Sequence, residues 1–324
     1  MYILSDSELK LPAAIRELSR VIAHEQPAII QSFNTDGNLI AYLAMRRTPV
    51  SYFFASLRNT NKSRLEMLVE RRIKHAYTRV IVNSIATKEE LVRSASMQNE
   101  DIEIIHNGID TDFFRPSSEP AKQALRRRYD IPANAYVVIS VGRIARQKNH
   151  ECTIRALALL RDRIGSDVPV VWLCLGLVEN KSYFRQLRRL IKAHHLDNIC
   201  RFIESAAEVP EYYGLADVSV LSSYWEGMPN ALLESMACER LAIVADSADN
   251  DGIVQTVVNG LSFTTNNAEM LADALVLVKN MDGKMKREIE RRARTDIINH
   301  YNMDTMVRRY QELYRQHTVN SLGK

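Results

Sequence analysis

Residues 222–236 read Ser-Ser-Tyr-Trp-Glu-Gly-Met-Pro-Asn-Ala-Leu-Leu-Glu-Ser-Met and follow the short apolar run 218–221. The run is typical of a buried strand, and residues 229–237 have the pattern of a helix that starts behind a glycine with proline in its first turn. We therefore expect a strand that turns sharply into a helix. The first N–H groups of such a helix have no internal partner and lie at the positive end of its dipole, which suits them to bind phosphate.

Three residues of this stretch could carry chemistry. Gly227 has no Cβ, so the backbone can come close to a ligand there. Glu226 precedes the predicted helix and Glu234 lies about one turn beyond Asn230, so one carboxylate can face a ligand while the other reaches hydroxyls beside the first turn. The alternative is an ordinary loop and helix with two solvated glutamates, and residues elsewhere in the chain decide between the two.

Length and composition bound the class of protein. A chain of 324 residues has the size of two domains, and 46% hydrophobic with 25% charged residues is ordinary for a globular protein. A net charge of +4 without concentrated basic patches indicates no nucleic-acid partner. Arginine clusters at 126–128, 188–189 and 291–292 are typical of solvated helix faces, and attraction to an anionic membrane is the alternative.

Cysteine usage and hydropathy bear on the compartment. The four cysteines form no CxxC pair and the histidines have no metal-ligand spacing, so we expect reduced thiols and no metal site. No apolar run approaches the roughly 20 residues that span a bilayer. We therefore expect a cytoplasmic protein, with peripheral contact at the inner face of the membrane as the alternative.

Strand and helix patterns alternate along both halves, which predicts parallel sheets covered on both faces. The expected strands are 27–31, 50–55, 79–82, 102–105, 136–141, 168–175, 199–203, 218–221 and 241–245. The expected helices are 11–24, 38–47, 62–77, one from Thr87 with a Thr87–Glu90 capping pair, 149–163, 183–194, 209–215, 229–237, 268–281 and 284–315, with a turn at 34–37. The turn Asn107-Gly-Ile-Asp110 and the polar segment 117–120 break the pattern and place a domain boundary there.

A second turn, Gly142-Arg-Ile-Ala-Arg-Gln-Lys148, follows the most apolar of these strands. Ligands of open parallel sheets bind at the carboxyl ends of the strands, so this turn and residues 222–230 can converge on one crevice. The planar fork of Arg143 and the compact charge of Lys148 suit a diphosphate. For an isolated R-x4-K pair, two exposed surface cations would be the better interpretation, but the neighbouring Glu226 turn favours a binding site.

Residues 141–149 and 226–234 together resemble the family-4 retaining glycosyltransferases with the GT-B fold, and so do the E-x7-E spacing, Ala216-Asp217 and Asn107-Gly-Ile-Asp110. The likeness covers roughly residues 26–280. It implies an α/β fold of two Rossmann-like domains facing across a cleft: an acceptor-side domain at 1–117, a nucleotide-sugar-binding domain at 118–295, and a C-terminal helix at 296–324 that crosses back to the first domain.

The resemblance also implies an activity. It indicates a retaining, metal-independent hexosyltransferase that uses a UDP- or GDP-sugar as substrate, needs no cofactor, and acts on a glycan or lipid-linked acceptor in cell-surface polysaccharide synthesis. Arg143 and Lys148 would hold the donor diphosphate, Glu226 the transferred sugar and Glu234 the ribose hydroxyls. The backbone from Gly227 through Met228 and Pro229 to Asn230 would complete the phosphate cradle, and Gly142 would also bind the substrate.

This chain departs from the family pattern in three places. Only about 25 residues precede the strand at 27–31, so the first βαβ unit is expected to be missing and the N-terminal domain incomplete; a misplaced start, a degraded copy and a sheet rebuilt from residues 1–31 are alternatives. Arg58 stands where the family often has histidine, and it is either a substrate-binding cation or a surface residue. Changes at 238–240 and at 251–252 concern the choice of sugar or acceptor.

Two other functions stay open at the level of sequence. The short start favours a non-catalytic nucleotide-sugar-binding protein or an inactive truncated remnant. A non-hydrolysing sugar-nucleotide epimerase shares the two-domain architecture, and the E-x7-E spacing argues against it.

Overall fold

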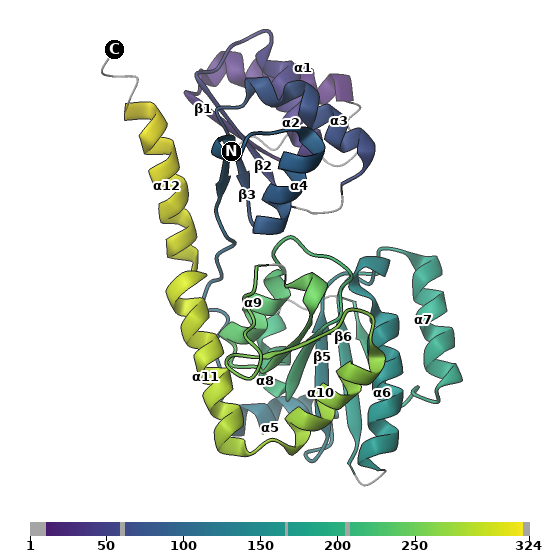
Figure 1. The fold of residues 1–324 in the computed structure, drawn as a ribbon. Helices are drawn as coiled ribbons and strands as arrows, with labels where there is room; N and C mark the ends of the chain where they lie inside the picture. Colours follow the sequence, from purple (N-terminus) through teal and green to yellow (C-terminus); the bar gives the residue numbers. More distant parts are fainter. Residues whose placement is uncertain (1–10, 59–61, 166–167, 205–207, 250, 320–324) are drawn as a thin grey trace. The chain divides into compact units, whose positions relative to one another are not determined.

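The chain forms two compact units, seen in a computed structural model that describes residues 11–58, 62–165, 168–204, 208–249 and 251–319 (Figure 1). One unit holds the described residues up to His106 together with those from Arg308 onward, and the other is Asn107–Val307. The chain therefore passes between the units twice, the second time within helix α12 (Met303–Val319). The predicted boundary after residue 117 lies inside the second unit.

The first unit contains a parallel sheet with the strand order β1-β2-β3-β4. Its strands are β1 (Ile29–Phe33), β2 (Tyr52–Leu57), β3 (Arg79–Val82) and β4 (Ile102–Ile104). Its helices are α1 (Leu11–Glu25), α2 (Asn34–Met45), α3 (Arg64–Ile73) and α4 (Ile85–Ala95). Because α2, α3 and α4 are right-handed crossovers that all step in the same direction, they lie on one face of the sheet, and α1 packs on α2 (Figure 1).

The opposite face of this sheet is covered by the second half of α12. The rings of Tyr314 and His317 meet the buried ring of Phe54 edge-on, with centroids 5.1 and 5.5 Å away. Arg309 bonds to Glu103 at 2.8 Å at the other end of this contact. Both faces of the sheet are therefore covered, as the alternation of strands and helices predicted.

Two predicted details of the first unit are wrong. Residues 34–37 are the first turn of α2 and not a separate turn, because the buried side chain of Asn38 accepts a hydrogen bond from Ser32 Oγ (2.6 Å) and donates to Glu70 Oε1 (3.0 Å). Helix α4 is capped by Ser84, whose Oγ accepts from the N–H of Thr87 at 3.2 Å. A local sequence pattern shows neither the distant hydrogen-bond partners of Asn38 nor the extended backbone of Ser84.

The second unit contains a six-stranded parallel sheet in the order β10-β9-β8-β5-β6-β7. Its strands are β5 (Tyr136–Val141), β6 (Val170–Leu175), β7 (Cys200–Ile203), β8 (Val218–Leu221), β9 (Ala242–Ala245) and β10 (Leu261–Phe263). Val138 on β5 lies opposite Trp172 on one side and Val218 on the other. The sequence order of the strands reverses between β5 and β8, which makes their carboxyl ends the switch point where ligands of such sheets bind.

Helices cover both faces of this second sheet (Figure 1). They are α5 (Glu119–Arg128), α6 (His150–Ile164), α7 (Lys181–Ala193), α8 (Val209–Leu215), α9 (Asn230–Ala237), α10 (Ala268–Asn280) and α11 (Gly283–His300). Helix α6 packs on α7 and α10, α5 packs on α8, and α9 packs on α11. Along β5, Val138 belongs to the core beneath α6, whereas Val137 and Ile139 belong to the core beneath α8. Within the described ranges, no helix combines the length and the apolar character needed to cross a membrane.

The sequence patterns missed two elements of this unit. Strand β10 has three residues, too few to show a period. Helix α5 starts in the segment that we expected to be a linker, where the Oγ of Ser118 caps it and Pro120 lies in its first turn. Proline and serine signal helix starts as well as loops, so composition alone did not separate the two.

The helix expected at 284–315 is interrupted. Between α11 and α12, the N–H of Ile109 donates to Tyr301 O (2.8 Å) and the N–H of Met303 donates to Ile109 O (3.0 Å). A Cβ at Gly108 would lie 2.8 Å from the carbonyl oxygen of Asn302, so this approach requires glycine. The Asn-Gly turn that marked the boundary in the sequence thus pairs with the break between two helices.

A buried cluster of charges joins α5 to the sheet. Asp217 accepts from Lys122 Nζ at 2.6 Å and from Arg126 Nη2 at 2.7 Å. Burial opposes ionisation of Asp217, but attraction to the two cations outweighs it and holds the pKa of this carboxyl below its usual value. The interpretation of 126–128 as a solvated face is wrong for Arg126, which is 3% exposed and also donates to the carbonyl of Leu215.

Candidate functional site

The turns that follow β5 and β8 meet at the switch point. The N–H of Tyr224 donates to Gln147 O at 2.8 Å, and Ser222 Oγ donates to Lys148 O at 2.9 Å. The two stretches that the sequence singled out, about 80 residues apart, are therefore bonded directly to each other.

An ion pair forms the centre of this junction. Lys148 Nζ lies 2.6 Å from Glu226 Oε1, and the two side chains are 14% and 10% exposed. Glu226 also accepts from Ser223 Oγ (2.7 Å) and from Gln147 Nε2 (3.2 Å). The carboxylate is thus held by three donors from both turns, and it can exchange one of them for a ligand without losing the others.

Gln147 and Ser223 were not among the predicted site residues. Gln147 Nε2 also donates to the carbonyl of Trp225 at 2.8 Å, so a single amide holds both this carbonyl and the Glu226 carboxylate. The sequence indicated them only by position, since Gln147 precedes Lys148 and Ser223 stands three residues before Glu226. Neutral amides and hydroxyls are so common in loops that this signal is weak.

Gly142 lies beneath the side chain of Lys148. Its φ is +146°, and a Cβ there would come within 2.9 Å of Lys148 Cε. A Cβ on the neighbouring Gly176 would lie 1.9 Å from the carbonyl oxygen of Gly142, so the ends of β5 and β6 approach each other as closely as two glycines allow. The side chain of Lys148 passes over Gly142, where no Cβ is present, to reach Glu226.

Arg143 does not join the ion pair. Its guanidinium bonds to Glu179, in the loop after β6, and the two side chains are 61% and 48% exposed. The structure thus directs Lys148 toward the β8 turn and Arg143 toward the β6 turn. Sequence spacing could not separate these two directions, since residues five apart across a turn have no fixed relative orientation. The predicted contact of Arg143 with a diphosphate stays a prediction.

Helix α9 begins one residue later than expected. Pro229 is its N-cap, with extended backbone (ψ 109°), and its carbonyl accepts from the N–H of Leu232 at 3.1 Å. The proline is therefore not within the first turn, because the chain is still turning out of the loop at that residue. A proline side chain has no acceptor with which to cap the helix, so the N–H groups of Asn230 and Ala231 are those that a phosphate oxygen could take.

Asn107 holds the loop in front of this helix. Its Nδ2 donates to Met228 O (3.2 Å) and to Asn230 Oδ1 (2.7 Å), and its N–H donates to Met228 Sδ (3.1 Å). The sequence marked Asn107 only as part of a turn. The structure shows it as the residue that fixes the start of α9, and the half-buried Gly227 lies directly before the bonded Met228.

Glu234 is half-buried on the first turns of α9. Its Oε2 accepts from Tyr213 Oη at 3.4 Å, and the same hydroxyl donates to Ala231 O at 3.0 Å. Burial raises the pKa of Glu234, while the tyrosine hydrogen bond and the charge of Lys148 partly oppose that rise. A carboxylate in such a setting gains by accepting hydrogen bonds from ligand hydroxyls.

Arg58, the last of the predicted residues, lies in the first unit. Its Nη2 donates to Tyr310 Oη at 3.3 Å, and its guanidinium lies over the ring of Phe33 with 5.4 Å to the centroid. Its contribution to substrate binding stays a prediction. Across the part of the chain that the structure covers, no group of three or more His, Cys, Asp and Glu side chains is arranged to hold a metal ion.

The two parallel sheets match solved structures of GT-B glycosyltransferases. One is Alr3699/HepE of Anabaena in complex with UDP and glucose, which superposes with a TM-score of 0.85 at 19% identity over 94% of this chain and 82% of that one. Residues 121–296 match the family model described as glycosyl transferases group 1, and residues 2–113 match the one described as glycosyltransferase family 4. The chain belongs to the group 1 glycosyl transferases of family 4, which confirms the resemblance found in the sequence.

Curated relatives are similar over much of the chain. The putative glycosyltransferase EpsD of Bacillus subtilis is 28% identical over 76% of this chain and 66% of its own length. The UDP-Gal:alpha-D-GlcNAc-diphosphoundecaprenol alpha-1,3-galactosyltransferase of Escherichia coli is 27% identical over 75% of this chain and 61% of its own length. The match thus spans less than two thirds of either relative. The family-4 match begins at residue 2, so it does not show that a first βαβ unit is missing, and that absence stays a prediction.

Proposed function

We propose that this protein is a retaining hexosyltransferase that moves a sugar from a UDP- or GDP-sugar to a glycan or lipid-linked acceptor, without a metal ion, in cell-surface polysaccharide synthesis. The observation that carries the proposal is the Lys148–Glu226 pair at the switch point of the second sheet, beside the uncapped start of α9. The second unit would bind the donor and the first unit would serve the acceptor. Its place would be the cytoplasmic side of the membrane.

The pair suits a donor that brings its own negative charge. Before the donor binds, Glu226 neutralises Lys148, so the ammonium is not left unpaired at a nearly buried site. The diphosphate would take over Lys148 and the amides of Asn230 and Ala231. Glu226 would stay fixed by Ser223 and Gln147 and would accept hydrogen bonds from hydroxyls of the transferred sugar.

The same arrangement would favour the chemical step. In retaining transfer the bond between the sugar C1 and the diphosphate oxygen breaks, and a bond to the acceptor oxygen forms on the same face of the sugar. The acceptor hydroxyl gives its proton to the departing diphosphate. Lys148 and the α9 amides would stabilise the charge that develops on that leaving group, which is usually the largest catalytic term for such reactions. Glu234 would bond the ribose hydroxyls.

The relatives support the substrate classes. The Anabaena structure contains UDP and glucose, and the Escherichia coli relative is named for a UDP-sugar donor and a diphosphoundecaprenol-linked acceptor. A lipid-linked glycan precursor is therefore the acceptor class to test first. The departures at 238–240 and 251–252, near the ends of α9 and β9, are where we would look for the choice of sugar.

A panel of UDP- and GDP-sugars tests the proposal. We expect one donor class to raise the melting temperature, since a ligand at one hundred times its Kd adds about 2.7 kcal/mol of stability. With lipid-linked acceptors, that donor should release nucleoside diphosphate and yield a product with retained anomeric configuration. Binding without turnover for any acceptor would support the non-catalytic alternative. Inversion of the donor sugar without acceptor would indicate the epimerase, and no binding at all would refute all three.

A further inference from the structure

We propose that the outer face of helix α7 binds an acidic polysaccharide, that is, a glycan chain with a negative charge at regular intervals. The choice of this ligand rests on the proposed function in polysaccharide synthesis. The face includes the cluster at 188–189, for which the sequence pattern indicates a solvated helix face. Five exposed cations form it, and together they are named the α7 row: Lys181, Arg185, Arg188, Arg189 and Lys192.

The α7 row lies along one side of its helix. The buried side chains of α7, Tyr183, Leu187 and Ile191, repeat every four residues and pack toward the core. Neighbouring cations of the row are three or four residues apart and lie on the opposite side, because a helix turns once in about 3.6 residues. At a rise of about 1.5 Å per residue, the row is roughly 16 Å long. It can therefore contact several sugar units of one chain.

No acidic side chain within this segment neutralises the α7 row. Residues 181–195 contain five Lys and Arg and no Asp or Glu, so the segment carries +5, whereas the whole chain carries +4. None of the five cations forms an ion pair with another residue that the structure describes. Like charges three or four residues apart destabilise a helix. A ligand with regularly spaced negative charges would relieve this repulsion.

Other arginine-rich helices of the second unit contain or contact their own counter-ions. On α11, Arg291 and Arg292 both pair with Glu288. At the end of α6, Arg163 pairs with Asp273 of α10 at 2.7 Å. The α7 row differs from these helices because its charges are left for a partner outside the described chain.

The first turns of α7 are held against the turn that carries Lys148. The guanidinium of Arg146 lies over the ring of Tyr183, 5.3 Å from its centroid, and its Nη2 donates to Gln186 Oε1 at 3.2 Å. Arg146 starts the short 3-10 helix η3 (Arg146–Lys148), which ends at the lysine of the candidate site. The α7 row therefore begins close to the place where we propose that the sugar donor binds.

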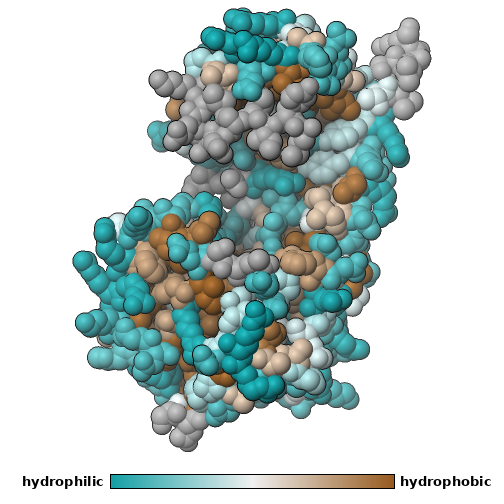
Figure 2. Space-filling model, turned by 180° about the vertical axis from the view of Figure 1, so that it is seen from behind, coloured by the Kyte–Doolittle hydropathy of each residue, from teal (hydrophilic) through white to brown (hydrophobic). Residues whose placement is uncertain are grey.

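The composition of the face favours a sugar polymer over other anions. Helix α7 lies at the outer edge of the second unit in Figure 1, and Figure 2 shows this edge, at its left, covered with hydrophilic side chains. Within α7, which the structure describes in full, no large apolar side chain is exposed. Helices in a membrane surface need such side chains, protein interfaces need an apolar core, and single-stranded nucleic acids need aromatic rings. Acidic glycans need only the charges and donors of lysine and arginine.

Titration calorimetry of the full chain with polygalacturonate, and with dextran as the uncharged control, tests the inference. We expect binding to polygalacturonate only, with a Kd that rises as salt is added. In the triple variant Arg185→Gln/Arg188→Gln/Arg189→Gln, the Kd should rise on the order of tenfold, because three exposed ion pairs are lost. The variant with lysine at the same three positions keeps the charges and should stay within a few-fold of the parent.

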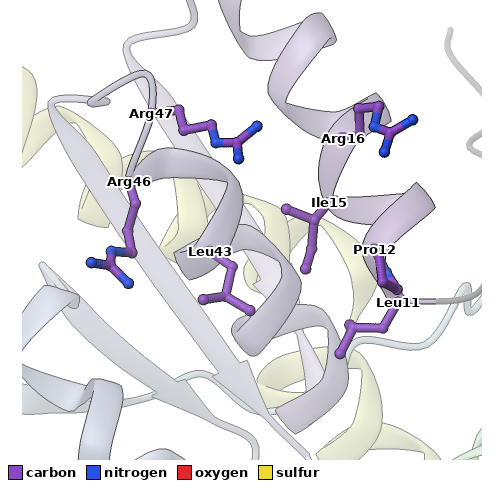
Figure 3. Close-up of a pocket in the computed structure, with 7 residues that line it drawn as sticks. All are labelled: Leu11, Pro12, Ile15, Arg16, Leu43, Arg46 and Arg47. Carbon is purple, nitrogen blue, oxygen red and sulfur yellow. The ribbon is translucent and has the colours of Figure 1, made fainter.

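A matched control removes three exposed arginines of the first unit, which line a pocket of about 580 Å³ between α1 and α2 (Figure 3): Arg16, Arg46 and Arg47. It lowers the net charge equally and should keep the Kd of the parent. Unchanged thermal stability would show that the variants are folded. The inference is overturned if polygalacturonate does not bind, if dextran binds equally well, if the control variant loses as much affinity, or if duplex DNA binds the α7 row more tightly.

Sugar transfer, measured separately, keeps this inference apart from the proposed function. Transfer by a protein that does not bind polygalacturonate would overturn only the role of the α7 row. Binding of polygalacturonate through the α7 row without use of any nucleotide-sugar would refute only the proposed transfer.

Discussion

Replacing Lys148 by methionine tests whether its ion pair is catalytic or only structural. The substitution leaves Glu226, whose side chain is 10% exposed, without its cation. Removing one partner of a buried pair costs about 3–5 kcal/mol. We expect the low end, about 3 kcal/mol, because Ser223 and Gln147 still donate to the carboxylate. If Lys148 also stabilises the leaving diphosphate, kcat should fall on the order of a hundredfold or more.

A double variant separates the two effects. Lys148→Met with Glu226→Gln removes both charges, and replacing a buried pair by neutral groups of similar size is often nearly neutral for stability. We therefore expect the free energy of unfolding to return to within about 1 kcal/mol of the parent. The rate should not return, because the ammonium of Lys148 no longer faces the departing phosphate. Urea unfolding gives the first quantity, and release of nucleoside diphosphate with saturating donor gives the second.

Two outcomes would refute this reasoning. If Lys148→Met lowers stability while kcat stays within a few-fold of the parent, the lysine only neutralises Glu226. If the double variant recovers activity as well as stability, the loss in the single variant came from disorder at the junction and not from missing charge. Glu226→Gln alone is the control, since it keeps the cation.

Three further substitutions probe the scaffold. Asp217→Asn should lower the free energy of unfolding in urea by about 3–5 kcal/mol at neutral pH, because Arg126 and the neighbouring lysine lose their counter-ion. The folded pKa of Asp217 is lowered, so its stabilising effect is present above its unfolded pKa and is lost as pH falls through the folded pKa. The difference in stability between parent and variant should therefore disappear in acid. Gly142→Ala forces a Cβ onto Lys148 at φ +146°, and we expect about 1–3 kcal/mol of strain together with weaker diphosphate binding in calorimetry; an unchanged Kd would show that the lysine does not need this path. Asn107→Ala leaves the turn before α9 without its clamp and should cost about 1–3 kcal/mol in thermal unfolding with a higher Kd for UDP, whereas a change in stability alone would mean that the clamp does not shape the site.

The architecture was predictable because it rests on short-range patterns. Runs such as 136–141 are apolar at every position but Ser140, which is the pattern of a strand covered on both faces, and the structure has β5 at those residues. Apart from the short strand β10 and the proline-led start of α5, the predictions were wrong where a partner far along the chain decides the structure. Helix α2 starts at Asn34 because Asn38 bonds to Glu70, 32 residues away, and Arg126 is buried because its counter-ion is 91 residues away.

The candidate site was predictable to the level of the two turns but not to the direction of each side chain. The alternation of strands and helices predicts parallel strands whose carboxyl ends share one edge of the sheet, and Lys148 and Glu226 meet at that edge because β5 and β8 are neighbours. The pairing of Arg143 with Glu179 depends on rotamers at an exposed position, which several arrangements satisfy with little difference in energy. Asn107 was missed as a clamp because its partners are 121 and 123 residues away.

Because α12 is divided between the two units, the first unit cannot be produced separately by cutting the chain once. Because the strand layer around Phe54 relies on aromatic rings from near the C-terminus, a fragment that stops at residue 106 would expose that ring to water. Anyone wishing to produce the N-terminal half separately should graft residues 308–319 back through a short linker.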